Sequence, residues 1–266
     1  MASSRRSAFP QGFGVVILLA ALLACKSKKP EDLGPDPGAV PIGATPGVAP
    51  VAPAAGSPTS HATACIPVTS QDTTSGSGTA LVTMIEFIDL QCPFCRRAQA
   101  TVDTLRKNYD DNELRIVVKH FPLPFHKQAR DAALAAQAVQ QTSGSAVAMK
   151  FMSLALENQS DLPSTDFAPW VLQAGGDSEQ FRTAKASATV SAKVDADMQQ
   201  MKALSGNGTP TFFINGAKLM GAQPYEKFQS AIEAEIKETQ KLKAAGTAPD
   251  QLYVARCREN LGSLTK

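Results

Sequence analysis

The sequence has no marked excess of charge of either sign and no apolar run long enough to cross a bilayer. Its 26 lysines and arginines nearly balance its 24 aspartates and glutamates, leaving a net charge of +2. The basic residues are scattered, whereas nucleic-acid binding needs a basic stripe, so we expect no nucleic-acid partner. The most apolar segment, Gly14 to Ala24, is too short to span the hydrocarbon core of a membrane.

Cysteine is also scarce, with only 5 in 266 residues. Cys92 and Cys95 lie close together, whereas Cys25, Cys65 and Cys257 are isolated from one another. A structural zinc site needs a second closely spaced pair of ligands, which this chain does not offer. We therefore predict no metal site, and nothing in the sequence calls for a bound cofactor.

The N-terminus is typical of an export signal. Arg5 and Arg6 precede the apolar segment, which ends in Ala24 followed by Cys25. This ending resembles the bacterial lipobox, which implies that residues 1–25 are a signal peptide and that Cys25 is lipidated. The alternatives are an ordinary signal peptide or a short anchor. In each case we expect the mature chain outside the cytoplasm, in the periplasm of the cell envelope; with the lipid, it is anchored to the membrane.

Two further segments flank the predicted domain, residues 65–244. Residues 26–64 are rich in proline, alanine and glycine and have no apolar periodicity, so they cannot bury a core. We predict a flexible linker that tethers the domain to the membrane. Residues 245–266 form a C-terminal tail whose short amphipathic segment we expect to pack back on the domain.

Cys65 and Cys257 lie at the two ends of the domain. In an exported protein, two such leftover cysteines suggest a structural disulfide, because disulfides persist outside the cytoplasm. Two alternatives stay open: both thiols are free, or Cys257 joins a second copy of the chain.

The first half of the domain has the pattern strand, helix, strand. Ala80–Ile88 is an apolar run of strand length, and apolar residues after Cys92 recur at helical spacing. Leu114–Val118 is a second strand, which we expect to lie parallel to the first. A right-handed crossover should join the two strands.

The second half is helical before strand character returns. Alanine-rich helical segments fill about residues 127–204, and strands at 211–214 and 217–220 flank Asn215-Gly216, a type I′ hairpin signal. A final helix begins near Pro224. The predicted fold is therefore α/β, a thioredoxin-like fold with an inserted all-helical subdomain.

Cys92 and Cys95 lie where the first predicted strand passes into a helix. The first helical turn has unpaired N–H groups and a partial positive charge, which should stabilise a thiolate at Cys92 and lower its pKa. Pro93 suits the first helical position because its missing N–H would be unpaired there anyway. We expect Cys92 to be the attacking thiol and Cys95, one turn further on, to be the resolving thiol.

The segment from Glu86 to Cys95, EFIDLQCPFC, resembles the active-site segment of DsbA-like disulfide oxidoreductases. The likeness continues in KHFPL at 119–123 and in GTPTFFING at 208–216. It implies a substrate site made of Pro93, Phe94, Thr209 and Pro210. In that site Pro210 is a cis-proline facing the cysteines, and the Thr209 backbone pairs with a bound substrate strand; the alternative for Pro210 is an ordinary turn proline.

Glu86 stands inside an otherwise apolar strand, where a carboxylate is costly to bury. The resemblance implies that it lies under the cysteines as a catalytic residue and assists proton transfer to the resolving thiol. The alternative is a solvated carboxylate at a strand edge. His120 and His126 are predicted to be structural, and Asp89 to shape the approach to the helix.

The predicted function is thiol–disulfide exchange, by a dithiol oxidase that forms disulfides in exported proteins with cysteines. The strongest oxidants of the family that it resembles have a histidine where this chain has Phe94, so we predict an intermediate redox potential. The resemblance suggests a membrane quinone-linked reoxidase as partner. The alternatives are a disulfide reductase or isomerase, and a non-catalytic chaperone on a thioredoxin scaffold.

Overall fold

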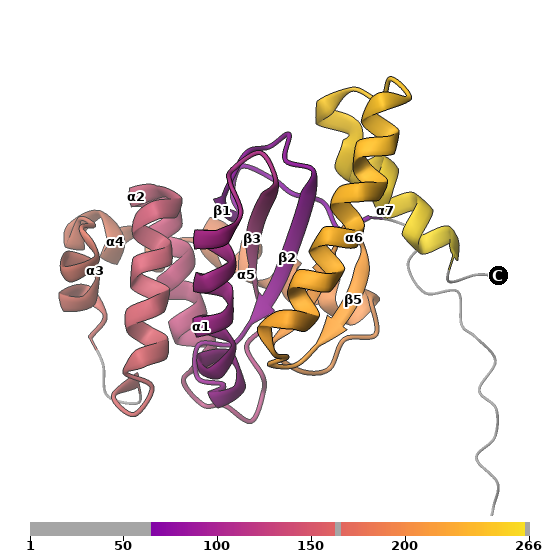
Figure 1. The fold of residues 1–266 in the computed structure, drawn as a ribbon. Helices are drawn as coiled ribbons and strands as arrows, with labels where there is room; N and C mark the ends of the chain where they lie inside the picture. The colour runs from indigo at the N-terminus through magenta and orange to yellow at the C-terminus, as the bar shows by residue number, and fades with distance from the viewer. Residues whose placement is uncertain (1–64, 163–165, 264–266) are drawn as a thin grey trace, which may run out of the picture. The chain divides into compact units, whose positions relative to one another are not determined.

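The computed structural model describes residues 65–162 and 166–263 (Figure 1). The predicted signal peptide 1–25, with Cys25, and the predicted linker 26–64 lie outside these residues and stay predictions. Within the described part of the chain, no helix is both long and apolar enough to cross a membrane.

A five-stranded sheet lies at the centre, in the order β1-β3-β2-β4-β5. The strands are β1 (Thr73–Ser75), β2 (Val82–Ile88), β3 (Leu114–His120), β4 (Thr211–Ile214) and β5 (Ala217–Met220). β2 is parallel to β3, as the sequence pattern predicts, while β1, β4 and β5 each run antiparallel to a neighbour. All seven residues of β2 are buried, which agrees with its apolar sequence and central place.

Helices cover both faces of this sheet. α1 (Pro93–Asn108) and α6 (Tyr225–Ala244) lie on one face, in front of the sheet in Figure 1, and their apolar side chains pack on Val82 and Met84 of β2. α5 (Ala188–Ala203) and α7 (Leu252–Ser263) contribute to the core on the opposite face. Because side chains alternate along a strand, Glu86 belongs to the same face as Met84, beneath α1.

The helical insertion between β3 and β4 is an α-helical layer beside the sheet (Figure 1). It consists of α2 (Ala129–Glu157), α3 (Ala168–Ala174), α4 (Ser178–Lys185) and α5 (Ala188–Ala203). α2 is interrupted at Gly144, whose φ of 78° and ψ of 176° are not helical. Glycine adopts this positive φ without steric cost, so the long helix becomes two shorter ones joined at a kink.

A buried network of four charges joins the insertion to the sheet. Asp72 precedes β1, Lys119 lies on β3, and Lys193 and Asp197 lie on α5. Each ammonium contacts both carboxylates, at 2.8 and 3.4 Å for Lys119 and at 2.8 and 2.7 Å for Lys193. Burial alone would raise the pKa of Asp72, but the two lysines hold it below its usual value. The two opposite pairs compensate one another, which makes burial tolerable.

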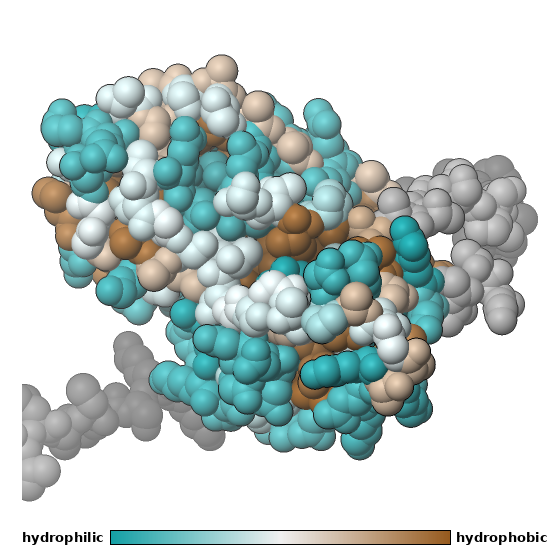
Figure 2. Space-filling view, turned by 90° about the horizontal axis from the view of Figure 1, so that it is seen from above, coloured by the Kyte–Doolittle hydropathy of each residue, from teal (hydrophilic) through white to brown (hydrophobic). Residues whose placement is uncertain are grey.

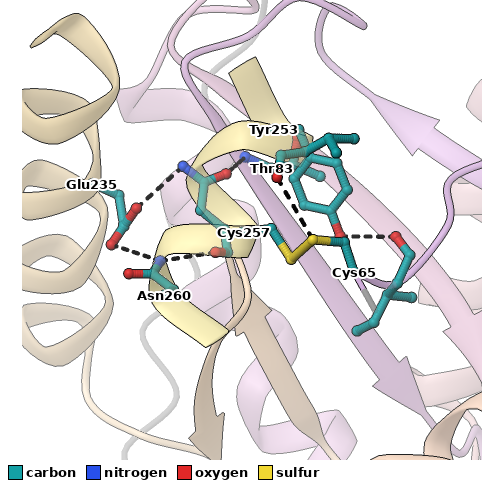
Figure 3. The surroundings of a disulfide bond; sticks show 9 residues. Cys65, Thr83, Glu235, Tyr253, Cys257 and Asn260 are labelled. Atoms are coloured by element: carbon teal, nitrogen blue, oxygen red, sulfur yellow. Dashed lines mark hydrogen bonds between the residues drawn. A yellow bond between two sulfur atoms is a disulfide. The ribbon is translucent and has the colours of Figure 1, made fainter. Parts of the chain in front are cut away.

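The C-terminal residues pack against the sheet instead of extending from it. After α6, a short 3₁₀ turn (Pro249–Gln251) leads into α7 (Leu252–Ser263), whose Tyr253 hydroxyl donates a hydrogen bond to the Ile66 carbonyl at 2.8 Å. Of the three arrangements left open by the sequence, the structure has the intramolecular disulfide between Cys65 and Cys257, with their Cα atoms 5.9 Å apart (Figure 3).

A polar network lies beside this disulfide (Figure 3). The buried Asn215 side chain accepts a hydrogen bond from the Thr83 N–H at 2.9 Å, and Asn260 donates one to the Asn215 carbonyl at 2.8 Å. Glu235 of α6 forms a two-point ion pair with Arg256 of α7, at 2.7 and 2.9 Å. The β4–β5 turn is thereby tied to β2, α6 and α7.

Figure 2 views the molecule from above Figure 1. Most of this face is hydrophilic, and hydrophobic side chains gather near its middle. Large apolar side chains with half or more of their surface exposed are few among the described residues, namely Phe94, Phe125, Leu172 and Met220. Phe94 is the residue between Pro93 and Cys95.

Candidate active site

Cys92 and Cys95 lie at the junction of β2 and α1. Cys92 is the residue before the first turn of α1, with extended φ and ψ of −76° and 122°, and Pro93 is the first helical residue. Both thiols are free and both side chains are buried, with 2% and 1% of their surfaces exposed. The local geometry is the one that the spacing of the two cysteines predicts.

The two thiols have opposite acidities. A hydrogen bond from the Cys95 thiol is the main reason that the pKa of Cys92 is lowered to about 5, and contact with Thr209 and the N–H groups of Cys95 and Phe94 add to it against the effect of burial. Burial and the adjacent Cys92 hold the pKa of Cys95 well above its ordinary value. At neutral pH, Cys92 is therefore a thiolate and Cys95 keeps its proton.

The loop before β4 faces Cys92. The Thr209–Pro210 peptide bond is cis, as the resemblance implies, and both residues are buried. The Cys92 sulfur lies 3.4 Å from the Thr209 carbonyl oxygen, to which the thiol form donates a hydrogen bond. Pairing of the Thr209 backbone with a substrate strand stays a prediction.

Glu86 lies in the interior of the sheet, so the alternative of a solvated carboxylate at a strand edge is wrong. β2 has β3 on one side and β4 on the other, and only 4% of the Glu86 surface is exposed. Burial, with a smaller effect of the Asp103 charge, raises the pKa of Glu86 to about 8. It lines a pocket of about 20 Å³ together with Gln99 and Arg106 of α1, which is room for one water molecule. Its part in proton transfer stays a prediction.

Asp89 organises the turn that leads from β2 to Cys92. Its buried carboxylate accepts hydrogen bonds from the N–H groups of Gln91 and Leu123, at 2.7 and 2.9 Å, and lies 2.7 Å from Nδ1 of His126. These contacts fit the structural roles predicted for Asp89 and His126.

His120 is fully enclosed at the end of β3. Neither of its ring nitrogens has a hydrogen-bond partner among the described residues, and burial lowers its pKa to about 4. It is therefore neutral at physiological pH, and its backbone N–H donates to Asp197 of the buried charge network at 3.1 Å. This position fits the structural role predicted for His120.

Two glutamines that the sequence interpretation missed hold the active-site turn. The Gln159 side-chain amide donates to the backbone carbonyls of Leu90 and Cys92, at 2.9 Å each. The Gln91 side chain accepts a hydrogen bond from the Gln128 N–H at 2.8 Å. Gln128 and Gln159 flank the two ends of α2, which would be about 43 Å apart in a straight helix of this length. The kink at Gly144 thus brings both ends to the turn; an isolated glutamine gives no sequence signal of such a contact.

Pro93 and Phe94 are exposed beside Cys92. Phe94 has 52% of its surface exposed, and the Arg97 guanidinium lies over its ring, 4.8 Å from the centroid. Both residues are accessible to a bound chain, while their contact with a substrate stays a prediction. In the described residues, no group of three or more histidine, cysteine, aspartate or glutamate side chains is arranged to hold a metal ion.

The similarity to known proteins covers the part of the chain that contains this site. A family model described as thioredoxin matches residues 69–234. The chain is similar to a thioredoxin-like oxidoreductase from Silicibacter pomeroyi DSS-3, with 26% identity and a TM-score of 0.53 over 63% of this chain and 93% of that one.

Two further solved structures share the fold at lower identity. Oxidised BdbD from Bacillus subtilis is 22% identical, with a TM-score of 0.55 over 63% of this chain and 94% of that one. The thiol-disulfide exchange protein alpha-DsbA2 from Wolbachia pipientis is 18% identical, with a TM-score of 0.56 over 61% and 86%. At these identities the likeness concerns the fold.

Among curated proteins, the chain is similar to segments of much longer ones. The Na⁺/H⁺ antiporter NhaA 1 of Mycolicibacterium vanbaalenii is 34% identical over 170 residues, which are 62% of this chain and 26% of that protein. The protein of the same name from Mycolicibacterium gilvum is 33% identical over the same shares. The chain thus spans about a quarter of the length of these relatives.

Proposed function

The chain belongs to the thioredoxin family, and we propose that it is a DsbA-like thiol–disulfide oxidoreductase working through Cys92 and Cys95. The observation that carries the proposal is the inequality of the two thiols. A pKa of about 5 makes Cys92 a thiolate at neutral pH, beside a protonated Cys95. This is the arrangement that disulfide exchange requires, with one sulfur to form the mixed disulfide and one to resolve it.

We propose that the chain works as a dithiol oxidase. A substrate thiolate attacks the Cys92 sulfur of the Cys92–Cys95 disulfide, a mixed disulfide forms, and Cys95 leaves and takes up a proton. The second substrate thiolate then attacks the substrate sulfur of the mixed disulfide and displaces Cys92 as a thiolate. The substrate loses two electrons and gains a disulfide, while the protein gains two electrons and becomes the dithiol. A low pKa supports this direction because it makes Cys92 a good leaving group.

Glu86 is proposed as the group that supplies the proton to Cys95. Because its pKa is raised to about 8, it is protonated at pH 7 and able to donate as a thiolate develops above it. Its position on the face of the sheet beneath α1 supports this role. Donation restores the buried Cys95 to its neutral form, which avoids an unpaired charge in the core.

The pKa of Cys92 also bears on the redox potential. Its value of about 5 lies between the reactive cysteine pKa values of about 7 for thioredoxin and about 3.5 for DsbA. The reduced form should therefore be stabilised more than in thioredoxin and less than in DsbA. This supports the intermediate potential that Phe94 suggests.

We infer a location outside the cytoplasm, in the cell envelope. The Cys65–Cys257 disulfide supports this location, since structural disulfides persist in oxidising compartments. Lipid anchoring at Cys25, a tether at 26–64, exported protein substrates and a quinone-linked reoxidase complete the proposal, and these rest on the sequence.

Two assays test the activity and its direction. The oxidised protein should restore activity to reduced, unfolded ribonuclease faster than it catalyses the reduction of insulin by dithiothreitol. The Cys92→Ser variant should be inactive in both assays. Faster insulin reduction would favour the reductase or isomerase alternative, and equal results for wild type and variant would favour a non-catalytic chaperone.

A further inference from the structure

Two large aromatic side chains near Cys92 are exposed to solvent. Phe94 follows Pro93 directly, and Phe125, 71% exposed, comes from the loop after β3. The Phe125 ring packs edge-on against His126, 4.7 Å between centroids, and His126 is bonded to Asp89 of the active-site turn. Phe125 is therefore held near the cysteines by a short chain of contacts, although solvent covers most of its ring.

Three cations share this surface and have no partner of opposite charge among the described residues. Arg96 and Arg97 are the fourth and fifth residues of α1, and Lys127 follows His126; all three are exposed. In the described residues no carboxylate pairs with any of them. By contrast, Arg106, Arg130, Arg182 and Arg256 each lie beside an aspartate or glutamate.

The position of Arg96, at the end of the first turn, is unfavourable for the helix itself. The N-terminus of a helix carries a partial positive charge, so cations in its first turn are destabilising and acidic residues are preferred there. The first turn of α1 has no acidic residue. Arg97 contacts the Phe94 ring, and in the described residues neither arginine has a carboxylate partner, so both charges are available to a chain that approaches the site.

The geometry of Arg97 leaves it available to a ligand. Its guanidinium carbon lies over the Phe94 ring, 4.8 Å from the centroid. None of its N–H groups pairs with a carboxylate of the described residues, and a guanidinium can bind a carboxylate at two points. Asp89, the acidic residue of the turn, is buried and already bonded, so it does not neutralise the surface.

We propose that this surface, formed by Phe94, Arg96, Arg97, Phe125 and Lys127, selects cysteine-bearing protein segments in which acidic and apolar residues flank the cysteine. The proposal rests on the proposed function and names its substrate class. The aromatic rings take the apolar residues, the cations take the carboxylates, and the segment lies extended past Cys92.

Two extended peptides that differ only in charge test the selection. Each contains one cysteine pre-activated as a mixed disulfide, with leucine on both sides, and the flanking charges are glutamates in one peptide and lysines in the other. The reduced protein should form its mixed disulfide with the glutamate peptide about tenfold faster at low salt, and the ratio should shrink in high salt because exposed charges are screened. A ratio near one, or one that does not depend on salt, overturns the proposal.

Variants assign the preference to the named side chains. In the double variant Arg96→Gln/Arg97→Gln the ratio should fall to about twofold, whereas Arg258→Gln, at an exposed arginine of α7 that has no carboxylate partner in the described residues, should retain it. Phe125→Ser should slow both peptides, and Leu172→Ser, at an exposed leucine of α3, should slow neither. An unchanged ratio in the double variant overturns the proposal.

Reaction with a neutral small dithiol tests the exchange activity separately from the selection of peptides. If the oxidised wild-type protein fails to oxidise dithiothreitol, the proposed function itself fails. If it oxidises dithiothreitol but does not distinguish the peptides, the exchange activity stands and the selection is wrong.

Discussion

The two cysteine pairs of the folded domain differ in their bonding, in their spacing along the chain and in their surroundings. Cys92 and Cys95 are free at the N-terminus of a helix, where a hydrogen bond from the Cys95 thiol, helped by N–H groups, lowers the pKa of Cys92. Cys65 and Cys257 are 192 residues apart in sequence and joined, with Cys257 in the apolar core on the α7 side of the sheet. Three of the four cysteines are buried, so burial does not explain why the pairs differ in reactivity. The hydrogen-bond donors and the bonding partner of each sulfur explain it.

The joined pair is fixed further by the β4–β5 turn. Gly216 has a φ of +91°, and a Cβ atom there would meet the Cys257 sulfur at 3.0 Å. Only four residues separate cis-Pro210 from this turn, so the same short strand β4 has the reactive pair at one end and the structural pair at the other. We expect the first pair to control chemistry and the second to control stability.

The largest expected effect is on the acidity of Cys92. Thiolate absorbance at 240 nm in the reduced protein should rise with a midpoint near pH 5, about 5 kcal/mol more favourable to the thiolate than an ordinary thiol. Because the folded pKa lies below that of the unfolded chain, this stabilisation of the reduced form is complete above about pH 8.5 and is lost as the pH falls through 5. Cys92→Ser should remove the transition, and a midpoint above pH 7 would contradict the assigned hydrogen bonds.

Removing the Cys65–Cys257 disulfide should lower the stability of the fold. Cys65→Ala/Cys257→Ala should lower the free energy of unfolding by about 2–4 kcal/mol, since the bond closes a very long loop. Urea unfolding measures this, and the Cys92 titration midpoint should stay near pH 5 in the variant. A shifted midpoint would show that the two pairs are coupled through β4.

The buried carboxyl under the reactive pair should cost stability. The pKa of Glu86 is raised to about 8 from an ordinary value of about 4.3, so folding becomes less favourable as the pH rises from about 4.5 to 8. Glu86→Gln should therefore stabilise the protein by about 1–3 kcal/mol at pH 7, while slowing proton transfer to Cys95. Exposed Glu157→Gln is the control, and a variant no more stable than wild type at pH 8 would disprove the burial cost.

The smallest expected effect concerns Gln159. Gln159→Ala leaves the Leu90 and Cys92 carbonyls without this donor, which should lower the free energy of unfolding by about 1 kcal/mol. It should also shift the Cys92 titration midpoint, which the control Gln229→Ala on α6 should leave in place. An unchanged midpoint would mean that the insertion supports the turn without tuning its chemistry.

Features with a local cause could be predicted from the sequence. The Cys92-to-Cys95 turn at a helix start and the Asn215-Gly216 hairpin, with φ of 43° and 91°, follow from residues adjacent in the chain. The contacts of Gln159, and those of Lys193 and Asp197 with Asp72 and Lys119, could not be predicted, because these partners are far away in sequence and glutamine or lysine in a helix usually faces solvent.

By itself, the sequence determined where the proposed reactive thiol lies. The Cys92/Cys95 spacing, Pro93 and the strand–helix transition place a thiol at a helix N-terminus, since dihedral preferences and periodicity act within a few residues. Only the tertiary structure decided what surrounds these residues and what they contact. It buried Glu86 between two strands, brought Thr209 to Cys92, joined Cys65 to Cys257 and folded both ends of α2 onto the turn. Those outcomes depend on which distant surfaces meet, and that is decided by packing of the whole core.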